Sequence, residues 1–137
     1  DSEGHLVHID FGFILEISPG KNMKFESADF KLSHEMTQLL DPGGMRNSQF
    51  YHMFEEMCIR AFLAARSVAE PIITCVALMR HSGLPCFEIG HAVKNIRNRF
   101  HLDKSEKHVA AIIRGVVTNA YCKWTTAYYD KLQNYTY

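Results

Sequence analysis

Apolar side chains recur at helical spacing through most of this chain, and this pattern limits the possible fold more than any other feature. Serines suited to capping a helix precede two early runs: Ser33 opens a helix that ends near Leu40, and Ser48 opens a longer one. The segment Asp41-Pro42-Gly43-Gly44 separates them, because proline and glycine interrupt helices. The longer helix is predicted from its apolar positions Phe50, Tyr51, Phe54, Met57, Cys58, Ile59, Phe62 and Leu63.

The same spacing predicts further helices along the chain. One runs over residues 68–82, with Pro71 in its first turn and Gly83 just past its end. Another spans residues 88–100. A fifth begins at Asp103, where Asp103-Lys104-Ser105-Glu106 resembles a capping box. Its apolar face is Val109, Ile112, Ile113, Val116, Val117 and Ala120. A final helix is predicted over residues 123–137.

The N-terminal segment has a different character. Residues 1–4 predict a turn and residues 5–9 a strand, which together form the second half of a β-hairpin. Residues 13–17 either extend this strand or pack inward, and a long loop then continues to Lys31. Loops this long inside a compact domain are usually functional or disordered. The expected fold class is therefore α+β: a mostly helical fragment with a remnant β-hairpin at its N-terminus.

Bulk composition excludes several classes of function. The 137 residues suit one domain or a large piece of one, and 15 basic residues balance 15 acidic ones, so the net charge does not favour nucleic acid. No stretch approaches the ~20 apolar residues of a membrane span. The four cysteines form no C-x-x-C pair and are expected to be buried free thiols in a reducing compartment. The histidines lack the spacing of a zinc site. Without an initiator Met or a signal peptide, we expect a piece of a longer protein.

The segment His8-Ile9-Asp10-Phe11-Gly12-Phe13 is the candidate for chemistry. An Asp-Phe-Gly at a strand end, followed by a long loop, is typical of the magnesium motif of kinases. Magnesium neutralises the charge of the ATP phosphates and prefers oxygen ligands, which the carboxylate of Asp10 supplies. Gly12 gives the backbone freedom to turn away. The alternative is an ordinary Asp beside a core Phe, but the surrounding strand, loop and helices favour the kinase interpretation.

These residues also carry a family resemblance. His8-Ile9-Asp10-Phe11-Gly12 resembles phosphoinositide kinases and their large protein-kinase relatives. Residues 13–15, 18–20 and 30–36 resemble phosphatidylinositol 4-kinases, and residues 55–66 and 82–87 resemble the type III alpha form. Residues 36–42 and 123–128 resemble the plant versions of that form. Residues 1–137 are thus identified as the C-terminal part of a phosphoinositide 3-/4-kinase catalytic domain.

The resemblance implies a C-lobe of a protein-kinase-like fold without its N-lobe and catalytic loop. It implies ATP-dependent phosphorylation of phosphatidylinositol at the 4-position of the inositol ring by the intact parent, with ATP and Mg²⁺ as cofactors. Ile9 would lie against the adenine ring and Asp10 would bind the metal. The general base, the second magnesium ligand and the phosphate-gripping lysine lie upstream in the family. We therefore expect no catalytic residue beyond the metal ligand here, and no activity from the fragment alone.

Two further segments acquire roles from the resemblance. Residues 13–31 correspond to the activation loop, whose Lys21, Lys24 and Lys31 either contact the substrate phosphodiester and an anionic membrane surface or are ordinary solvated lysines. Residues 123–137 correspond to the C-terminal helix, in which Trp124 and Tyr128 are possible membrane contacts. Packing of these two side chains on the C-lobe is the preferred alternative. The sequence of residues 133–137 departs from the family, since it lacks the usual Gly-Ile.

The implied partners are phosphatidylinositol in a membrane surface and scaffold or regulatory proteins of the parent kinase, with no nucleic acid. The implied location is cytoplasmic and peripheral to a membrane, the plasma membrane for the parent. Two other functions stay open: a large protein kinase related to the lipid kinases, and a non-catalytic product of a truncated gene. Those large protein kinases have a distinctive C-terminal tail, and nothing after Trp124 resembles it.

Overall fold

The structure is a computed structural model that describes residues 3, 5, 7, 14, 15, 17, 30, 32–88 and 90–121. Its described part is helical, as predicted, and contains no strand. The α-helices are α1 (His34–Leu40), α2 (Gln49–Ser67), α3 (Ala69–Leu78), α4 (Ala92–Arg99) and α5 (Glu106–Ala120). Two short 3-10 helices, η2 (Met79–His81) and η3 (Pro85–Phe87), lie between α3 and α4.

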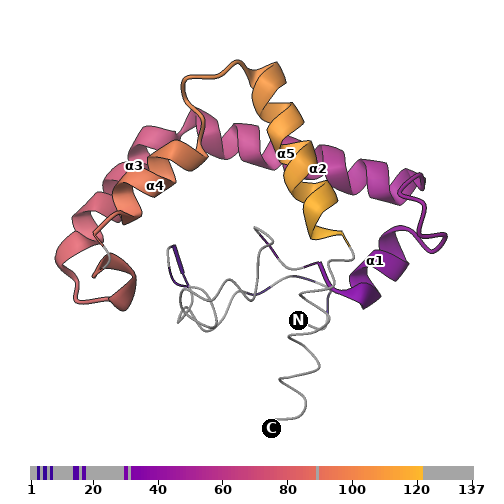
Figure 1. Ribbon diagram of the computed structural model, residues 1–137, viewed down its shortest axis with the longest axis horizontal. Coiled ribbons are helices and arrows are strands. Elements are labelled where there is room, and N and C mark those ends of the chain that lie inside the picture. Colours follow the sequence, from indigo (N-terminus) through magenta and orange to yellow (C-terminus); the bar gives the residue numbers. More distant parts are fainter. Residues whose placement is uncertain are drawn as a thin grey trace, which may run out of the picture.

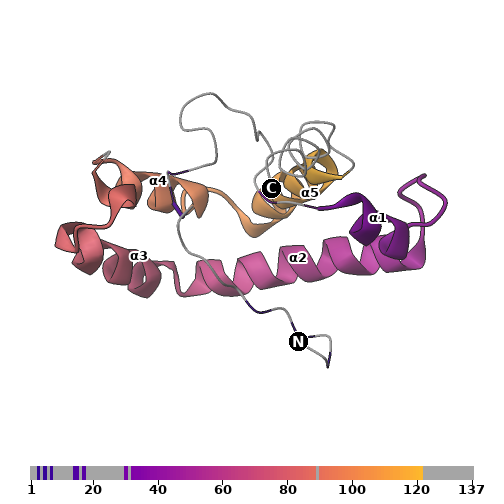
Figure 2. The same ribbon diagram turned by 90° about the horizontal axis from the view of Figure 1, so that it is seen from below.

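The helices form two layers. Helix α2 leads directly into α3, with a bend of 69° between α2 and the stretch made by α3 and η2. Helix α4 returns beside α3, whereas α5 crosses α2 and α1 packs near the start of α2 (Figure 1). Figure 2 shows that α4 and α5 lie on the same side of the layer formed by α2 and α3. The opposite side of α2 therefore carries none of the other labelled helices.

Two predicted helix starts are confirmed. The Ser33 side chain accepts a hydrogen bond from the Met36 amide at 3.4 Å, and Ser48 accepts one from the Tyr51 amide at 3.0 Å. These bonds satisfy amides that have no partner within the first turn of a helix. Helix α1 ends at Leu40, as the sequence predicts, and Asp41 is its C-cap.

The predicted helix over residues 68–82 corresponds to α3 followed by η2. Its last turn tightens into a 3-10 helix, and the chain then turns at Gly83, whose φ of +78° suits a residue without a Cβ.

Two predicted boundaries are wrong. The fourth helix begins at Ala92 instead of residue 88, because η3 occupies residues 85–87 and Gly90 has a φ of +78° that interrupts a helix. The fifth helix begins after Ser105 instead of at Asp103. The Ser105 side chain accepts from the His108 amide, while the Asp103 carboxylate lies 3.7 Å from the Lys104 ammonium.

The buried core lies where α2, α3 and α4 meet. Ala69, Ile73 and Phe100 form its buried centre, and half-buried apolar side chains such as Phe62 and Ile96 pack against it. Helix α5 buries one stripe, consisting of Val109, Ile113, Val117 and Ala120, which matches part of the apolar face predicted for it. This burial fixes α5 across α2 through the hydrophobic effect.

The structure corrects two expectations about apolar side chains. Phe50 and Met57 follow the apolar spacing of α2 but are each 61% exposed, while Tyr51 between them is buried. The cysteines are free where described, but only Cys86 is buried; Cys58 is half-buried and Cys75 is exposed, so the expectation of general burial was wrong. Burial, with a smaller effect of the nearby Glu55 carboxylate, raises the pKa of the Cys58 thiol. Cys122 lies outside the described residues.

The predicted N-terminal hairpin is not shown. Among its described residues, Glu3 lies in a turn and His5 and Val7 have no regular secondary structure; its other residues lie outside the described part. In the following segment, the Ile17 amide donates to the Ile14 carbonyl across a turn that contains Leu15. No single helix among the described residues has the length and apolar character needed to cross a membrane. Helix α2 meets that test only together with the α3–η2 stretch, across their bend.

Candidate functional site

The residues predicted to bind cofactor, metal, substrate or membrane all lie outside the described part of the chain. They are Ile9, Asp10, Lys21, Lys24, Lys31, Trp124 and Tyr128. Most of the predicted activation loop (13–31) and the whole predicted C-terminal helix (123–137) also lie outside it. The described residues do include α1, which follows the first of these segments, and the end of α5, which precedes the second.

Asp41, at the end of α1, is the centre of a polar cluster that joins distant parts of the sequence. Its side chain is only 2% exposed. Oxygen Oδ2 accepts a hydrogen bond from the Arg46 amide at 2.6 Å and another from the Tyr121 hydroxyl at 2.9 Å. Oxygen Oδ1 is buried without a hydrogen-bond partner among the described residues. We call Asp41, Arg46, Tyr51 and Tyr121 the Asp41 cluster.

The local sequence explains how the cluster forms. The turn after α1 brings the Gly44 amide to the Asp41 carbonyl at 2.9 Å, and the Ser48 hydroxyl donates to the Leu40 carbonyl. The turn thus folds back on the carboxylate that ends α1. A short side chain such as Asp suits this role, because it reaches backbone amides a few residues later.

Aromatic contacts complete the cluster. The Tyr121 ring meets the Tyr51 ring edge-on, with centroids 5.4 Å apart and planes at 89°. The guanidinium carbon of Arg46 lies 5.6 Å from the centroid of the Tyr121 ring, a cation–π geometry. Tyr121 directly follows α5, so these contacts tie the end of α5 to the start of α2 and to the turn after α1.

The balance of forces keeps Asp41 charged. Burial acts to raise its pKa, but hydrogen bonds from the Arg46 amide, the Tyr121 hydroxyl and the amides of Ser48 and Asn47 outweigh it, so the pKa of Asp41 lies below its ordinary value. The Asp41 carboxylate, hydrogen-bonded through Oδ2 at the end of α1, acts as an anchor between the turn after α1 and the residue that follows α5. The cluster therefore fixes Tyr121, shortly before residues 123–137, against the C-terminal end of α1.

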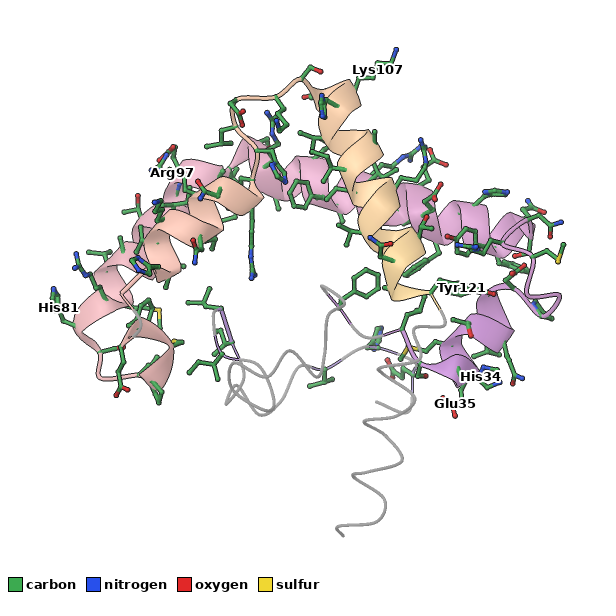
Figure 3. The ribbon with its side chains drawn as sticks, viewed as in Figure 1. His34, Glu35, His81, Arg97, Lys107 and Tyr121 are labelled. Carbon is green, nitrogen blue, oxygen red and sulfur yellow. The ribbon has the colours of Figure 1, made fainter. Side chains whose placement is uncertain are left out.

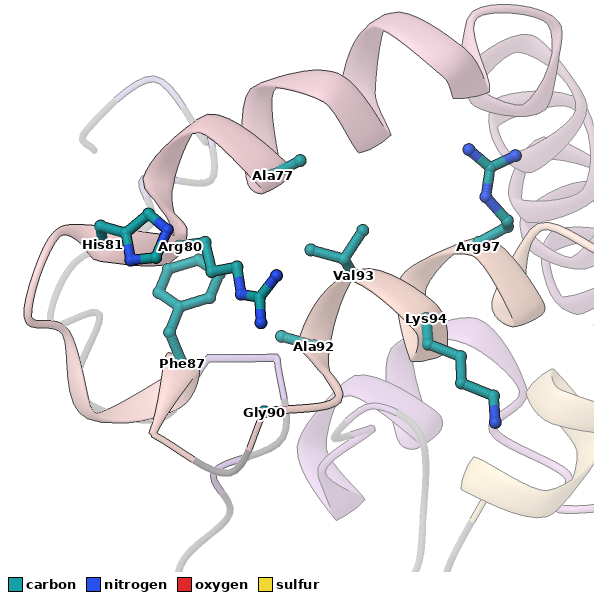
Figure 4. Close-up of a pocket in the computed structure, with 9 residues that line it drawn as sticks. All are labelled: Ala77, Arg80, His81, Phe87, Gly90, Ala92, Val93, Lys94 and Arg97. Carbon is teal, nitrogen blue, oxygen red and sulfur yellow. The ribbon is translucent and has the colours of Figure 1, made fainter.

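A second region of interest is a basic pocket between α3 and α4, with a volume of about 600 Å³. Figure 4 shows its residues: Ala77, Arg80, His81, Phe87, Gly90, Ala92, Val93, Lys94 and Arg97. Figure 3 shows that His81, at this pocket, lies far from Tyr121, in the Asp41 cluster. Sequence reasoning missed the pocket, because its cations come from two helices and form no motif.

One cation of this pocket is neutralised and others are not. The Arg97 guanidinium donates to the Glu70 carboxylate on α3, with 2.9 Å between Nη2 and Oε2. This hydrogen bond lowers the pKa of Glu70 and raises that of Arg97. No ion-pair partner is seen for Arg80 or Lys94 among the described residues. Within the same part of the chain, no group of three or more His, Cys, Asp or Glu side chains is placed to hold a metal.

Comparison with known proteins gives a consistent result. The sequence profile of the family "Phosphatidylinositol 3- and 4-kinase" matches residues 1–89, which include the Asp10-Phe11-Gly12 motif. The chain is 56% identical over 133 residues to Phosphatidylinositol 4-kinase alpha 2 and to Phosphatidylinositol 4-kinase alpha 1, both from Arabidopsis thaliana. It is 43% identical over 136 residues to Phosphatidylinositol 4-kinase STT4 from Saccharomyces cerevisiae.

These alignments cover 97% to 99% of this chain, so the similarity extends well past the matched profile. The chain spans 25% of the length of the first Arabidopsis relative and 7% of the length of the second and of the yeast relative. The predicted resemblance to plant alpha-type enzymes is confirmed.

Proposed function

Because the chain belongs to the phosphatidylinositol 3- and 4-kinase family, we propose that the protein containing it phosphorylates phosphatidylinositol at the 4-position of the inositol ring, with ATP as the phosphate donor. The observation that carries this proposal is the 56% identity, over nearly the whole chain, to two proteins named as phosphatidylinositol 4-kinases. A kinase of this family uses ATP and a divalent metal, and Mg²⁺ is the metal we propose.

Within this chain, Asp10 is the residue proposed to bind the metal. Its carboxylate is the hard oxygen ligand that Mg²⁺ prefers, and it lies in the Asp-Phe-Gly motif inside the matched region. The bound metal would neutralise charge on the transferring phosphate. Ile9 would contribute an apolar surface for the adenine ring. Both residues lie outside the described part, so this assignment rests on sequence.

The described helices would support the site from one side. The predicted activation loop ends just before α1, and the predicted C-terminal helix begins just after Tyr121. The Asp41 cluster holds Tyr121 against the C-terminal end of α1, which supports the proposal that the C-terminal segment starts from a fixed point. Lys21, Lys24 and Lys31 would face the phosphodiester of the lipid or the anionic membrane, and Trp124 and Tyr128 would pack on the C-lobe and secondarily touch lipid. We also propose a cytoplasmic, peripheral position at a membrane, with the plasma membrane being the one that the family resemblance implies.

The test is lipid phosphorylation by the full-length protein. Vesicles containing phosphatidylinositol are incubated with labelled ATP and Mg²⁺, and the position of the new phosphate is identified. Asp10→Asn keeps the size of the side chain but removes its charge, and we expect turnover to fall by roughly 100-fold or more, since a catalytic metal contributes several kcal/mol. Asp103→Asn, at an exposed aspartate far from the motif in sequence, is the matched control and should leave turnover unchanged.

Near-normal turnover by the Asp10→Asn variant would overturn the metal assignment. A protein substrate phosphorylated in place of the lipid would favour the large protein kinases related to this family. Residues 1–137 expressed alone should show no transfer, because the general base and the phosphate-gripping lysine lie upstream in this family. Lipid phosphorylation by that fragment would contradict this expectation.

A further inference from the structure

We propose that the tip of the α3–α4 pair docks on an anionic membrane, with the headgroup of an anionic phospholipid in the basic pocket. The tip is defined as Leu78, Met79, Arg80, His81 and Leu84 together with the pocket lined by Phe87, Val93 and Lys94. This surface is distinct from the segments 13–31 and 123–137 considered above. The inference deepens the proposed function by naming a place where the membrane would meet the protein.

The first observation is uncompensated positive charge. Arg80 and Lys94 line the pocket, and neither has an ion-pair partner among the described residues. Among the described residues that line it, none is acidic. Arg97, the third cation, is partly neutralised by Glu70, which lies outside the pocket. A concave site with this charge favours an anion, and phosphate groups are bound well by arginine and lysine.

The second observation is apolar exposure at the same end of the molecule. Leu78 is 80% exposed, and Met79 and Leu84 are also exposed. Leu78 and Met79 directly precede Arg80 and His81, on the last turn of α3 and on η2, and Leu84 follows three residues after His81, before η3. Single exposed apolar residues are ordinary on protein surfaces, but here they adjoin an open basic pocket.

The shape of the pocket suits a lipid headgroup beside an acyl region. Figure 4 shows Arg80 and Phe87 lining the pocket together with Ala92 and Val93, which are adjacent on the first turn of α4. A phosphate bound beside Arg80 would therefore lie in a pocket that is also lined by apolar side chains. A volume of about 600 Å³ is in the range of small-molecule sites and exceeds what one inorganic ion requires.

The combination of basic and apolar residues distinguishes a membrane from other occupants. Peripheral proteins bind membranes by inserting exposed apolar side chains while basic side chains attract anionic headgroups. A soluble phosphorylated compound would use the cations but would leave Leu78 and Leu84 in water. An acidic protein partner would use both sets, but it would not depend on the lipid composition of a vesicle.

The test measures membrane binding by the full-length protein without ATP, so its outcome is independent of the proposed lipid kinase activity. Sedimentation is compared between vesicles of phosphatidylcholine alone and vesicles that also contain phosphatidylserine. The double variant Arg80→Glu with Lys94→Glu should bind the phosphatidylserine vesicles on the order of 30-fold more weakly or worse, because each basic residue near an anionic surface strengthens binding several-fold. Arg99→Glu, on the same helix but outside the pocket, is the control and should have a much smaller effect.

The apolar part is tested separately. Leu78→Ser with Leu84→Ser should weaken binding to the same vesicles by about tenfold or more, since two exposed side chains would lose their burial in lipid. Leu39→Ser is the matched control, because Leu39 on α1 is also 80% exposed but lies away from the tip. Circular dichroism checks that every variant is folded, and Arg80→Gln with Lys94→Gln replaces the charge-reversed variant if that one is not.

The proposal stands if both tip variants lose binding and both controls keep it. It is overturned if either tip variant binds like the unmodified protein, or if Arg99→Glu weakens binding as much as the pocket variant does. It is also overturned if soluble glycerophosphoserine binds the pocket while binding to phosphatidylserine vesicles does not depend on Leu78 and Leu84. Recruitment by a partner protein that is insensitive to vesicle composition would equally contradict it.

Discussion

Arg66 on α2 makes the most concentrated set of polar contacts of any described side chain. Its Nε donates to the Phe100 carbonyl at 3.1 Å, and its Nη2 donates to the carbonyls of His101 and Lys104 at 3.1 and 2.6 Å. These carbonyls follow the end of α4, where backbone acceptors have no helical partner. His101 has a φ of +48°, a conformation that costs a residue with a side chain about 1–3 kcal/mol. Arg66 holds this strained turn in place.

Replacing Arg66 with Ala should therefore destabilise the chain clearly. Hydrogen bonds to a charged group contribute about 1.5–3 kcal/mol, so we expect a loss of that order in the free energy of unfolding. Urea denaturation followed by circular dichroism at low micromolar concentration measures it. Arg66→Lys keeps the charge but lacks the planar fork that reaches several carbonyls, so it should recover only a minor part. A Lys variant as stable as the unmodified chain would show that charge alone suffices.

Asp41 makes a prediction about pH. Because its pKa is lower in the folded chain than the ordinary value of 3.8, its charge contributes stability that is fully present above that ordinary value. This contribution is lost as the pH falls through the folded pKa. The difference in melting temperature between the unmodified chain and Asp41→Asn should thus be constant near neutral pH and shrink below pH 3.8.

A control for the Asp41 prediction is Tyr121→Phe, which removes one of the hydrogen bonds that lower the pKa. In the Tyr121→Phe background, the folded pKa of Asp41 should lie closer to 3.8. The stability that depends on the charge of Asp41 should therefore be smaller, and on acidification it should be lost at a higher pH than in the unmodified chain. A difference that stays the same down to pH 2 would mean that the charge of Asp41 does not stabilise the fold.

At the scale of whole elements, the sequence predicted helices better than it predicted their starts. Ser33 and Ser48 were identified correctly, because each is a capping residue directly before an apolar run. At the fifth helix the capping residue is Ser105 and not Asp103, and the turn before it is held by Arg66 of α2 through the Lys104 carbonyl. Such long-range contacts are invisible to a local pattern.

The start of the fourth helix was missed for a related reason. Apolar spacing over residues 88–100 fits a helix, but η3 and the positive φ of Gly90 set the first residues apart. Exposure was also hard to predict: Phe50 and Met57 have the spacing of core residues, yet the packing of α5 on only one side of α2 leaves them exposed. Periodicity identifies a face, whereas the neighbour that covers it is a tertiary property.

The ion pair between α3 and α4 gives a prediction about membrane binding. Glu70→Gln removes the carboxylate that holds Arg97, and Arg97 also lines the basic pocket. The released guanidinium should strengthen binding of the full-length protein to phosphatidylserine vesicles by up to about fivefold, as expected for one more free basic residue. The gain should be abolished in high salt, which screens exposed charges.

Glu56→Gln is the control for Glu70→Gln, since it breaks a comparable exposed ion pair with Arg60 on α2, away from the pocket. Equal gains from the two substitutions would indicate that overall charge, and not the pocket, decides membrane binding. Weaker binding by Glu70→Gln would show that the ion pair is needed to shape the pocket.

For the molecule as a whole, the sequence predicted the mostly helical character and the kinase family correctly. The proposed chemistry depends on Asp10 and on segments 13–31 and 123–137, which lie outside the described residues, so those assignments stay predictions. The described helices add what sequence patterns did not contain. They place Asp41 against Tyr121, 80 residues apart, and they bring the cations of two helices into one pocket. Both arrangements arise from tertiary packing.

The side of α2 opposite α5 leads to a prediction about the chain in isolation. Phe50, Met53 and Met57 occur three and four residues apart, so they share one face of the helix, and all three are exposed. Exposed apolar surface of this kind drives association between copies. Residues 1–137 alone should therefore self-associate at tens of micromolar concentration. Phe50→Ser with Met57→Ser should shift the chain toward monomer in analytical ultracentrifugation. Leu102→Ser, at an exposed apolar residue after α4, should not. A monodisperse monomer of the unmodified chain under these conditions would contradict the prediction.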